Sequence, residues 1–477
     1  MRSWRWMGLS AVLLVAGVGI GYQWHAADSP EPPMPAAAGI GDPYFPPAGN
    51  SGYDVTGYEI QLRYDPPTGR LDGRTTVNAL PTENRAEFAL DLRLPATQVT
   101  VNNQLARFHQ DRGKLLFSPT RPVPTGRPMV VQVTYGGVPS EVRDDLGHDP
   151  PWTRTVDGAV IAGEPEGAAW WFPANDHPSD KATVAVTVTV PAGLQAISNG
   201  KLLAGPEPAE PGWQRWRWRA SAPMATYLAF VAIGHYDIVT RDTPYGPYIA
   251  AFQDGLDPLT ATVARAAVEQ TPQIVGVLSG IFGPYPFDTI GGVVPDACAQ
   301  QSALETQTRP VYGPQMFRAG ADVSVVVHEL AHQWFGDTVS VHRWSDIWLN
   351  EGFASYAVWL YRERTGGPSA KQIADQTYLC NFANTDFWRV PPGDPGPDEL
   401  FNSAVYSRGA MALEALRTRV GDDAFFTGLR TWVTERQGHN GTVADFLALL
   451  ERISGKKVDD VAQTWLFAPV RPSTPPG

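Results

Sequence analysis

A short segment beyond the middle of the chain places two histidines and a glutamate at a spacing suited to metal binding. Residues 328–332 read His-Glu-Leu-Ala-His, which matches the pattern H-E-x-x-H. On a helix, residues four apart share a face, so His328 and His332 can reach one metal ion. Glu329 lies one position further round and can reach a water molecule beside that ion. The pattern predicts zinc-dependent hydrolysis with Glu329 as catalytic base.

A catalytic zinc site needs a third protein ligand and one open coordination position. A third histidine six residues after His332 is one known arrangement, but position 338 holds Thr338. The other arrangement is a glutamate on a following helix, and Glu351 in the sequence Asn-Glu-Gly supplies it. We therefore predict one zinc ion per chain, bound by His328, His332 and Glu351. The alternative, a chance match on a buried helix, becomes remote once Glu351 is added.

Two polar residues near the third ligand are candidates for holding the ligands in place. Ligating histidines usually donate their second N–H group to an oxygen atom. Asn350 and Asp346 lie close to Glu351 in the sequence and are predicted to accept such bonds. The alternative is that both residues cap local turns.

The segments that must position these residues are mainly helical. The pattern changes after about Asp257, and Thr442 followed by Asp445 is typical of a helix cap. Helices are predicted over residues 259–280, 325–335, 353–364, 404–419, 423–435, 443–453 and 458–466. We assign residues 241–469 to a mainly helical domain with some β-structure at its start.

The first half of the folded chain reads as β-structure. Short alternating runs separated by Pro and Gly turns predict strands, for example at 58–62, 183–188 and 227–231. In the Trp/Arg-rich segment 213–219, alternation predicts Trp216 and Trp218 on a buried face and the arginines outside. We assign residues 51–240 to an all-β domain, so the fold class is multidomain α+β.

Composition agrees with a folded protein that does not bind nucleic acid. The 477 residues are 43% hydrophobic and suggest two or three domains. The formal net charge of −12 argues against nucleic acid, whose phosphates need a basic face.

The two ends of the chain carry segments that we expect to lie outside the folded body. Arg2 and Arg5 precede an apolar run at 7–22, so residues 1–27 are predicted to be an export signal or a membrane anchor. The protein would then be secreted or tethered at the extracytoplasmic membrane surface. The Pro/Ala-rich residues 28–50 are predicted to be a linker, and residues 470–477 a disordered tail.

The chain has two cysteines, Cys298 and Cys380. In an exported protein they could form a disulfide, and the alternative is two free thiols.

The zinc motifs together resemble those of a known family. The segments His-Glu-Leu-Ala-His-Gln-Trp-Phe-Gly-Asp at 328–337 and Trp-Leu-Asn-Glu-Gly-Phe-Ala at 348–354 resemble the aminopeptidase N family of zinc exopeptidases, which are gluzincins. The resemblance implies an N-terminal β-saddle domain followed by a thermolysin-like catalytic domain. Many members continue with a large C-terminal helical domain, so this chain is expected to be a short form.

The resemblance also implies two carboxylates that bind the substrate's α-amine. Glu305, in Ser-Ala-Leu-Glu-Thr, occupies the place of the glutamate in the family's Gly-Ala-Met-Glu-Asn motif, although Gly, Met and Asn are replaced. Glu164 lies at the matching position upstream of Phe-Pro-Ala-Asn-Asp-His-Pro at 172–178, and Glu166 is the nearby alternative.

A tyrosine after the third ligand completes the set that the resemblance implies. Tyr406, in Val-Tyr-Ser-Arg-Gly-Ala, matches the tyrosine that donates its hydroxyl to the developing oxyanion. The expected activity is removal of N-terminal residues from peptides that have a free N-terminus. Two alternatives are a thermolysin-like endopeptidase and an inactive relative that only binds peptides.

Overall fold

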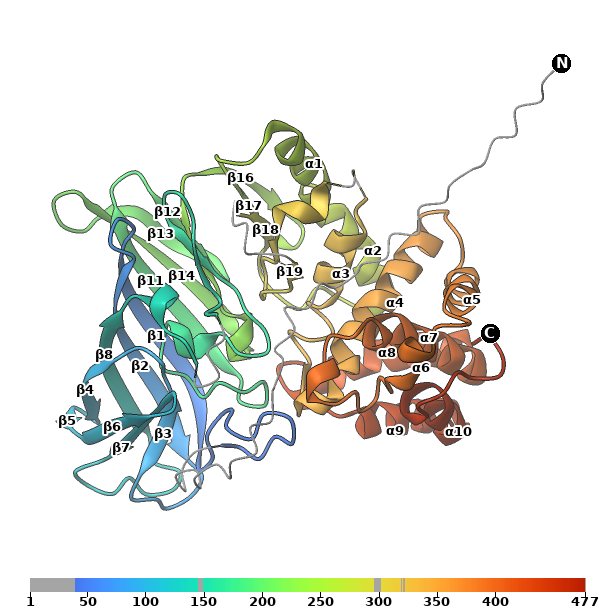
Figure 1. Cartoon of the computed structure of the whole chain (residues 1–477), viewed down its shortest axis with the longest axis horizontal. Coiled ribbons are helices and arrows are strands. Elements are labelled where there is room, and N and C mark those ends of the chain that lie inside the picture. The colour runs from blue at the N-terminus through green and yellow to red at the C-terminus, as the bar shows by residue number, and fades with distance from the viewer. Residues whose placement is uncertain (1–38, 145–148, 296–301, 319, 321, 477) are drawn as a thin grey trace.

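The computed structural model describes residues 39–144, 149–295, 302–318, 320 and 322–476 (Figure 1). A β-rich unit and a helical unit lie side by side, and the buried apolar side chains of both belong to one continuous core (Figure 1). This arrangement confirms the predicted order of an all-β domain followed by a mainly helical one. The predicted export segment 1–27 and residues 28–38 of the predicted linker lie outside the described residues.

The β-rich unit is built on a large twisted sheet. Its strand order is β13-β14-β11-β1-β2-β8-β4-β5, with β1 and β11 parallel and the remaining neighbours antiparallel. The strands are β1 (Tyr53–Asp65), β2 (Arg70–Pro81), β4 (Ala96–Val101), β5 (Gln104–Leu105), β8 (Met129–Gly137), β11 (Ala182–Pro191), β13 (Lys201–Pro208) and β14 (Trp213–Met224). On β14, Trp216 and Trp218 are buried and the arginines exposed, as the alternation predicted.

Two smaller sheets complete this unit. One has the order β12-β15-β10-β9 and the other β3-β7-β6. Their strands are β3 (Phe88–Asp91), β6 (Arg107–Asp111), β7 (Lys114–Ser118), β9 (Trp152–Arg154), β10 (Ala159–Ile161), β12 (Gln195–Ser198) and β15 (Val231–Gly234). The run 227–231, predicted as a strand, is instead a 3-10 turn at Thr226–Leu228 that leads into β15.

The helical unit begins with its own sheet, ordered β16-β17-β18-β20-β19. The strands are β16 (Tyr236–Thr243), β17 (Gly246–Gln253), β18 (Ile290–Val294), β19 (Ala303–Leu304) and β20 (Val311–Tyr312). The domain boundary expected at residue 240 therefore falls inside β16. The change occurs between β15 and Tyr236, because β15 belongs to a sheet of the β-rich unit, whereas β16 pairs with β17 in the sheet of the helical unit.

Helices form the rest of this unit. They are α1 (Pro258–Val268), α2 (Thr271–Phe282), α3 (Ser324–Ala331), α4 (Trp348–Arg364), α5 (Ala370–Cys380), α6 (Thr385–Arg389), α7 (Ser403–Val420), α8 (Asp422–Arg436), α9 (Val443–Ser454) and α10 (Asp459–Ala462), which a π-helical turn, η7 (Gln463–Phe467), follows. The long helix expected at 259–280 is two helices, because Pro272 lacks an amide donor and fits the first turn of α2. The cap of Thr442 and Asp445 at the start of α9 is confirmed.

The C-terminal residues differ from the expectation of a disordered tail. The carbonyl of Pro472 accepts a hydrogen bond from the Tyr378 hydroxyl at 2.6 Å, and Arg471 stacks over Phe382. The tail therefore starts against α5. Cys380 is exposed at the end of α5, whereas Cys298 lies outside the described residues, so their pairing stays a prediction.

No helix in the described ranges has both the length and the apolar character needed to cross a bilayer.

Candidate active site

Helices α3 and α4 bring the three predicted metal ligands together. Nε2 of His328 lies 3.1 Å from Oε2 of Glu351, and Nε2 of His332 lies 3.5 Å from the same oxygen. A tetrahedral ion with bonds of about 2.1 Å separates its ligand atoms by about 3.4 Å. Two imidazole nitrogens and a carboxylate oxygen at these distances fit zinc, and the three ligand atoms lie within 4.8 Å of one another.

Local packing explains why the two helices meet here. Val326, Val327 and Leu330 of α3 are buried, and the ring of Phe335 just after α3 packs on Phe353 of α4 with centroids 4.8 Å apart. This apolar contact holds the end of one helix against the start of the other. The two ligands of α3 and Glu351, which lies in the first turn of α4, therefore face one point.

A backbone carbonyl orients His332. Its Nδ1–H donates to the carbonyl oxygen of Phe335 at 3.0 Å, which leaves Nε2 free as a donor to a metal. The hydrogen-bond acceptor for His332 is thus a backbone carbonyl in the turn after α3, where the sequence had suggested Asp346 or Asn350.

Asp346 and Asn350 have other roles than the one predicted. Asp346 accepts a hydrogen bond from the Val443 amide at 3.0 Å, so it fixes the start of α9, as in the turn-capping alternative. Asn350 is fully buried, and its amide lies 3.4 Å from the hydroxyl of Tyr227 in the β-rich unit. Among the residues that the structure describes, neither side chain is hydrogen-bonded to a ligand histidine, and Oδ1 of Asn350 has no partner.

Glu329 lies beside the three metal ligands but does not belong to their cluster. Its carboxylate oxygen, one from Glu305 and a nitrogen of His332 lie within 4.8 Å of one another. Burial raises the pKa of Glu329 well above its ordinary value, and the charges of Glu305 and Glu351 raise it further. A bound divalent cation would favour the ionised form. Burial favours the protonated form of Glu329 and a bound cation favours the ionised form, so the carboxylate can take up a proton and release it again.

The charges of the ligands themselves are strongly coupled. Burial opposes ionisation of Glu351, but His332 and His328 lower the pKa of Glu351 to about 2. Burial also disfavours the charged form of His332, yet Glu305 and Glu351 raise its pKa well above its ordinary value. This excess of negative charge around two imidazoles is what a cation would neutralise.

Glu305 directly follows the edge strand β19, and its carboxylate lies near those of the metal site, beside Glu329 and His332. Its Oε1 accepts a hydrogen bond from the Tyr227 hydroxyl at 3.1 Å, and its backbone carbonyl accepts one from Gln333 at 3.1 Å. The side chain is 2% exposed, and burial raises the pKa of its carboxyl group.

Glu164, from the β-rich unit, approaches the site from the other domain. Burial raises its pKa well above the ordinary value, and the charges of Glu305 and Glu351 raise it further. In the described part of the chain its Oε1 has no hydrogen-bond partner. Glu166 instead lies 3.5 Å from Arg93, so the structure places Glu164 rather than Glu166 next to the other site carboxylates.

Tyr406, on α7, lies beside His328. Its ring stacks on that of His328 with centroids 5.9 Å apart and planes 22° from parallel. Burial and the charge of Glu351 raise its pKa well above the ordinary value, so the hydroxyl keeps its proton and can donate it. Two residues on, the buried Arg408 donates to the carbonyls of Trp388 and Trp465, which fixes α7.

Three residues of this site were not predicted from the sequence. Tyr227 looked like part of a strand, and only its contact with Glu305 reveals a role. Gln333 follows the zinc motif directly and could have been noticed there. Asp337 is fully buried near His332, and within the described residues neither carboxylate oxygen has a hydrogen-bond partner. Burial and the charge of Glu305 raise the pKa of Asp337 well above its ordinary value.

Comparison with known proteins identifies the family. Residues 315–465 match the peptidase family M1 domain, and residues 158–228 match the peptidase M1 N-terminal domain. The chain is 30% identical to the M1 zinc metallopeptidase from Deinococcus radiodurans, with a TM-score of 0.82 and coverage of 92% of this chain and 98% of that one. The chain belongs to peptidase family M1. The predicted resemblance and zinc requirement are thereby confirmed for this M1 peptidase.

Longer relatives agree with this assignment. Aminopeptidase N from Homo sapiens is 30% identical over 55% of this chain, and glutamyl aminopeptidase from Bos taurus is 28% identical over 65%. Aminopeptidase M1-B from Oryza sativa subsp. japonica is 26% identical over 86%. The matched regions cover 29%, 34% and 49% of these relatives, respectively, so the matched part of the chain spans less than half of each relative's length.

Proposed function

We propose that this M1 peptidase is a zinc-dependent aminopeptidase that removes N-terminal residues from peptides. The observation that carries the proposal is the convergence of two buried carboxylates, Glu164 and Glu305, beside the metal ligands from two different domains. Their mutual repulsion leaves a place for a cation, and the α-ammonium group of a peptide is such a cation. The scissile bond would then lie one residue away, at the metal.

The residues of the site divide the chemistry among them. His328, His332 and Glu351 would hold the zinc ion, which would supply Lewis-acid activation of water and of the scissile carbonyl. Glu329 takes a proton from the attacking water and passes it to the leaving amine. The Tyr406 hydroxyl donates to the carbonyl oxygen as negative charge develops on it.

Similar proteins support a substrate with a free amine. The curated relatives of this chain are named as aminopeptidases. A mutant form of the Deinococcus radiodurans enzyme, 29% identical, has been solved with the substrate Tyr-Ser-Ala, and a two-domain M1 zinc metallopeptidase mutant has been solved with L-tryptophan. Both the peptide and the amino acid carry a free α-amino group.

The test compares free and blocked substrates on the zinc-loaded protein. Aminoacyl amides and a short peptide should be cleaved, while the same compounds carrying an N-acetyl group should not. Cleavage of only the blocked peptides would assign the chain to the thermolysin-like alternative. A peptide that binds but is not cleaved in either form would assign it to the inactive alternative.

The base is tested by Glu329→Gln. This change keeps the shape of the side chain but removes the proton acceptor, so kcat should fall by about a thousandfold or more. Zinc content, measured by atomic emission on the same sample, should stay at one ion per chain. A variant with full zinc and parental kcat would contradict the role of Glu329.

We also propose that the enzyme acts outside the cytoplasm. The support is the sequence of residues 1–27, with its basic start and apolar run, and a disulfide between Cys298 and Cys380 would suit that location. Fractionation of cells that express the whole chain tests this. Enzyme found only in the cytoplasm, with two titratable thiols, would contradict both proposals.

A further inference from the structure

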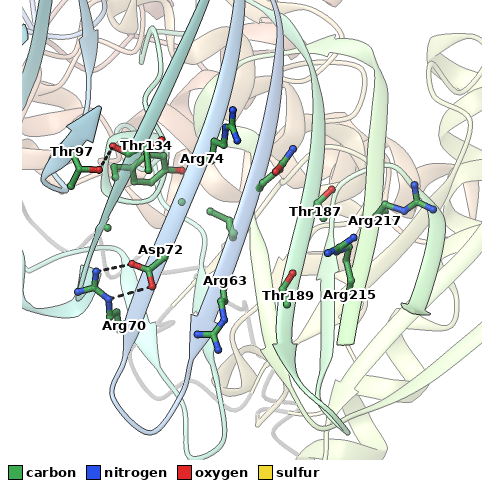
Figure 2. A pocket seen from close by; sticks show the side chains of 15 residues that line it. Arg63, Arg70, Asp72, Arg74, Thr97, Thr134, Thr187, Thr189, Arg215 and Arg217 are labelled. Atoms are coloured by element: carbon green, nitrogen blue, oxygen red, sulfur yellow. Dashed lines mark hydrogen bonds and ion pairs between the residues drawn. The ribbon is translucent and has the colours of Figure 1, made fainter. Parts of the chain in front are cut away.

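The outward face of the large sheet carries a groove of about 690 Å³ that is lined mainly by arginine and threonine side chains. Arg63 and Arg74 lie on one side of it, on β1 and β2 (Figure 2). Arg215 and Arg217 lie on the other side, on β14 (Figure 2). This groove lies on the β-rich unit, whereas the zinc ligands lie on or directly after helices of the other unit, and nothing in the proposed reaction uses the groove.

Strand pairing explains how the groove is formed. β11 lies between β14 and β1, and its outward side chains are short. Thr187 pairs with Arg217 on one side, and Thr189 pairs with Arg215 on the same side and with Arg63 on the other. The threonine hydroxyls therefore form a floor, and the guanidinium groups form the two walls.

The arginines are available to a new partner. The pairs Arg63–Glu210 and Arg217–Glu207 have N–O distances of 3.0 Å, but every one of these side chains is more than 40% exposed. Exposed ion pairs contribute little net stability, so an incoming carboxylate can exchange with the resident one. Among the described residues, no carboxylate pairs with Arg215.

We propose that this groove binds an extended, acidic peptide segment of a partner protein. Alternate residues of a strand lie about 6.6 Å apart on one face, which is the spacing of Arg215 and Arg217 and also of alternate carboxylates in an extended peptide. The planar guanidinium group matches a carboxylate with two parallel hydrogen bonds. Thr187 and Thr189 offer hydroxyls to the peptide's backbone groups.

Charge and shape both favour this partner. The whole chain has a formal net charge of −12, yet the five lining arginines outnumber Asp72 and the two paired glutamates, Glu207 and Glu210, so this face keeps an excess of positive charge that attracts an acidic ligand. A planar bilayer would touch the arginine walls but leave the threonine floor without a partner. A narrow chain can contact both.

The test measures binding of a fluorescent peptide to the full chain by anisotropy at low salt. The peptide has glutamate at alternate positions and is blocked at both ends, so that it offers no α-amine to the zinc site. A matched peptide with glutamine in place of glutamate is the neutral control. The glutamate peptide should bind, the glutamine peptide should not, and added salt should weaken binding.

Two double variants locate the site. Arg215→Gln with Arg217→Gln should weaken binding by about tenfold or more, because it removes two charge-assisted contacts. Arg389→Gln with Arg452→Gln removes two exposed, paired arginines from the helical unit and should leave binding unchanged. Both variants should keep the parent's peptidase activity and melting temperature, which shows that they fold.

Three results would overturn the proposal. The first is no binding of the glutamate peptide, and the second is equal weakening in both double variants. The third is tighter binding of heparin or of phosphatidylglycerol vesicles, lost in the Arg215/Arg217 variant, which would assign the groove to a polysaccharide or to a membrane instead.

Discussion

At the scale of single residues, the hydroxyl of Tyr406 is the group whose contribution can be isolated best. Tyr406→Phe keeps the ring that stacks on His328 and removes only the donor to the oxyanion. We expect kcat to fall by about a hundredfold with little change in KM, because this bond forms mainly in the transition state. Steady-state kinetics on an aminoacyl amide measures both constants.

A second tyrosine serves as the control. Tyr248 is buried in β17, away from the ligands, and donates to the carbonyl of Val268 at 3.2 Å. Tyr248→Phe should lower stability slightly and leave kcat unchanged. An equal loss of kcat in both variants would show that Tyr406 acts through packing and not through its hydroxyl.

The site residues differ in how far the sequence reveals them. His328, His332, Glu329 and Glu351 are marked by spacing alone, since only certain spacings bring metal ligands onto one face. Tyr227 carries no such mark, because its role depends on where one tight turn of the β-rich unit meets Glu305 of the other unit. Contacts between domains depend on how the domains pack, and the residue pattern of a single segment does not predict that packing.

At the scale of elements, Asp180 links β1 to the turn before β11. The amide of Val55 donates to its carboxylate at 3.1 Å, and Asn175 donates as well. Burial raises the pKa of Asp180 to about 7. Because this pKa is above the unfolded value, the protonated form stabilises the fold: the contribution is complete below the unfolded pKa and is lost as the pH rises through about 7.

Asp180→Asn removes this titration and tests it. Between pH 5 and pH 8 the parent should lose about 2–3 kcal/mol of unfolding free energy relative to the variant. Urea denaturation at the two pH values measures the difference. A difference that does not change with pH would show that Asp180 has the same pKa in the folded and unfolded chains.

Predicted and observed elements differ for local reasons. Apolar residues continue across 259–280, so periodicity alone suggests one helix, and Pro272 decides the break. Helix α5 was missed because its buried face consists of Ala370, Ala374 and Tyr378, two of which are too small to mark an apolar stripe. The capped helix α9, with its large apolar side chains, was predicted almost to its ends.

At the scale of the whole molecule, Arg309 joins the two units. It is fully buried, and it donates to Ile249 of β17 at 3.1 Å, to Gly200 at 3.1 Å and to Ser198 at the end of β12. Arg309→Met would leave these carbonyls without donors. We expect the unfolding free energy to fall by about 3 kcal/mol or more, measured by urea denaturation.

The same change should reach the active site. Thr306, next to Glu305, donates to the carbonyl of Arg309 at 2.7 Å, so a loosened Arg309 displaces the loop that carries Glu305. We expect KM for aminoacyl amides to rise. Arg389→Met, in an exposed ion pair, should change neither quantity, and a parental KM in Arg309→Met would show that the loop keeps its shape without the guanidinium group.

The origin of Glu164 and Glu305 in different domains has a mechanical consequence. Without a ligand, burial and the charge of Glu305 oppose ionisation of Glu164 across the junction. An ammonium group between the two carboxylates would attract both of them. The first residue of a substrate would then hold the two domains together. Even a free amino acid, which has no bond to cleave, would then stiffen the junction and raise the temperature at which the two halves separate.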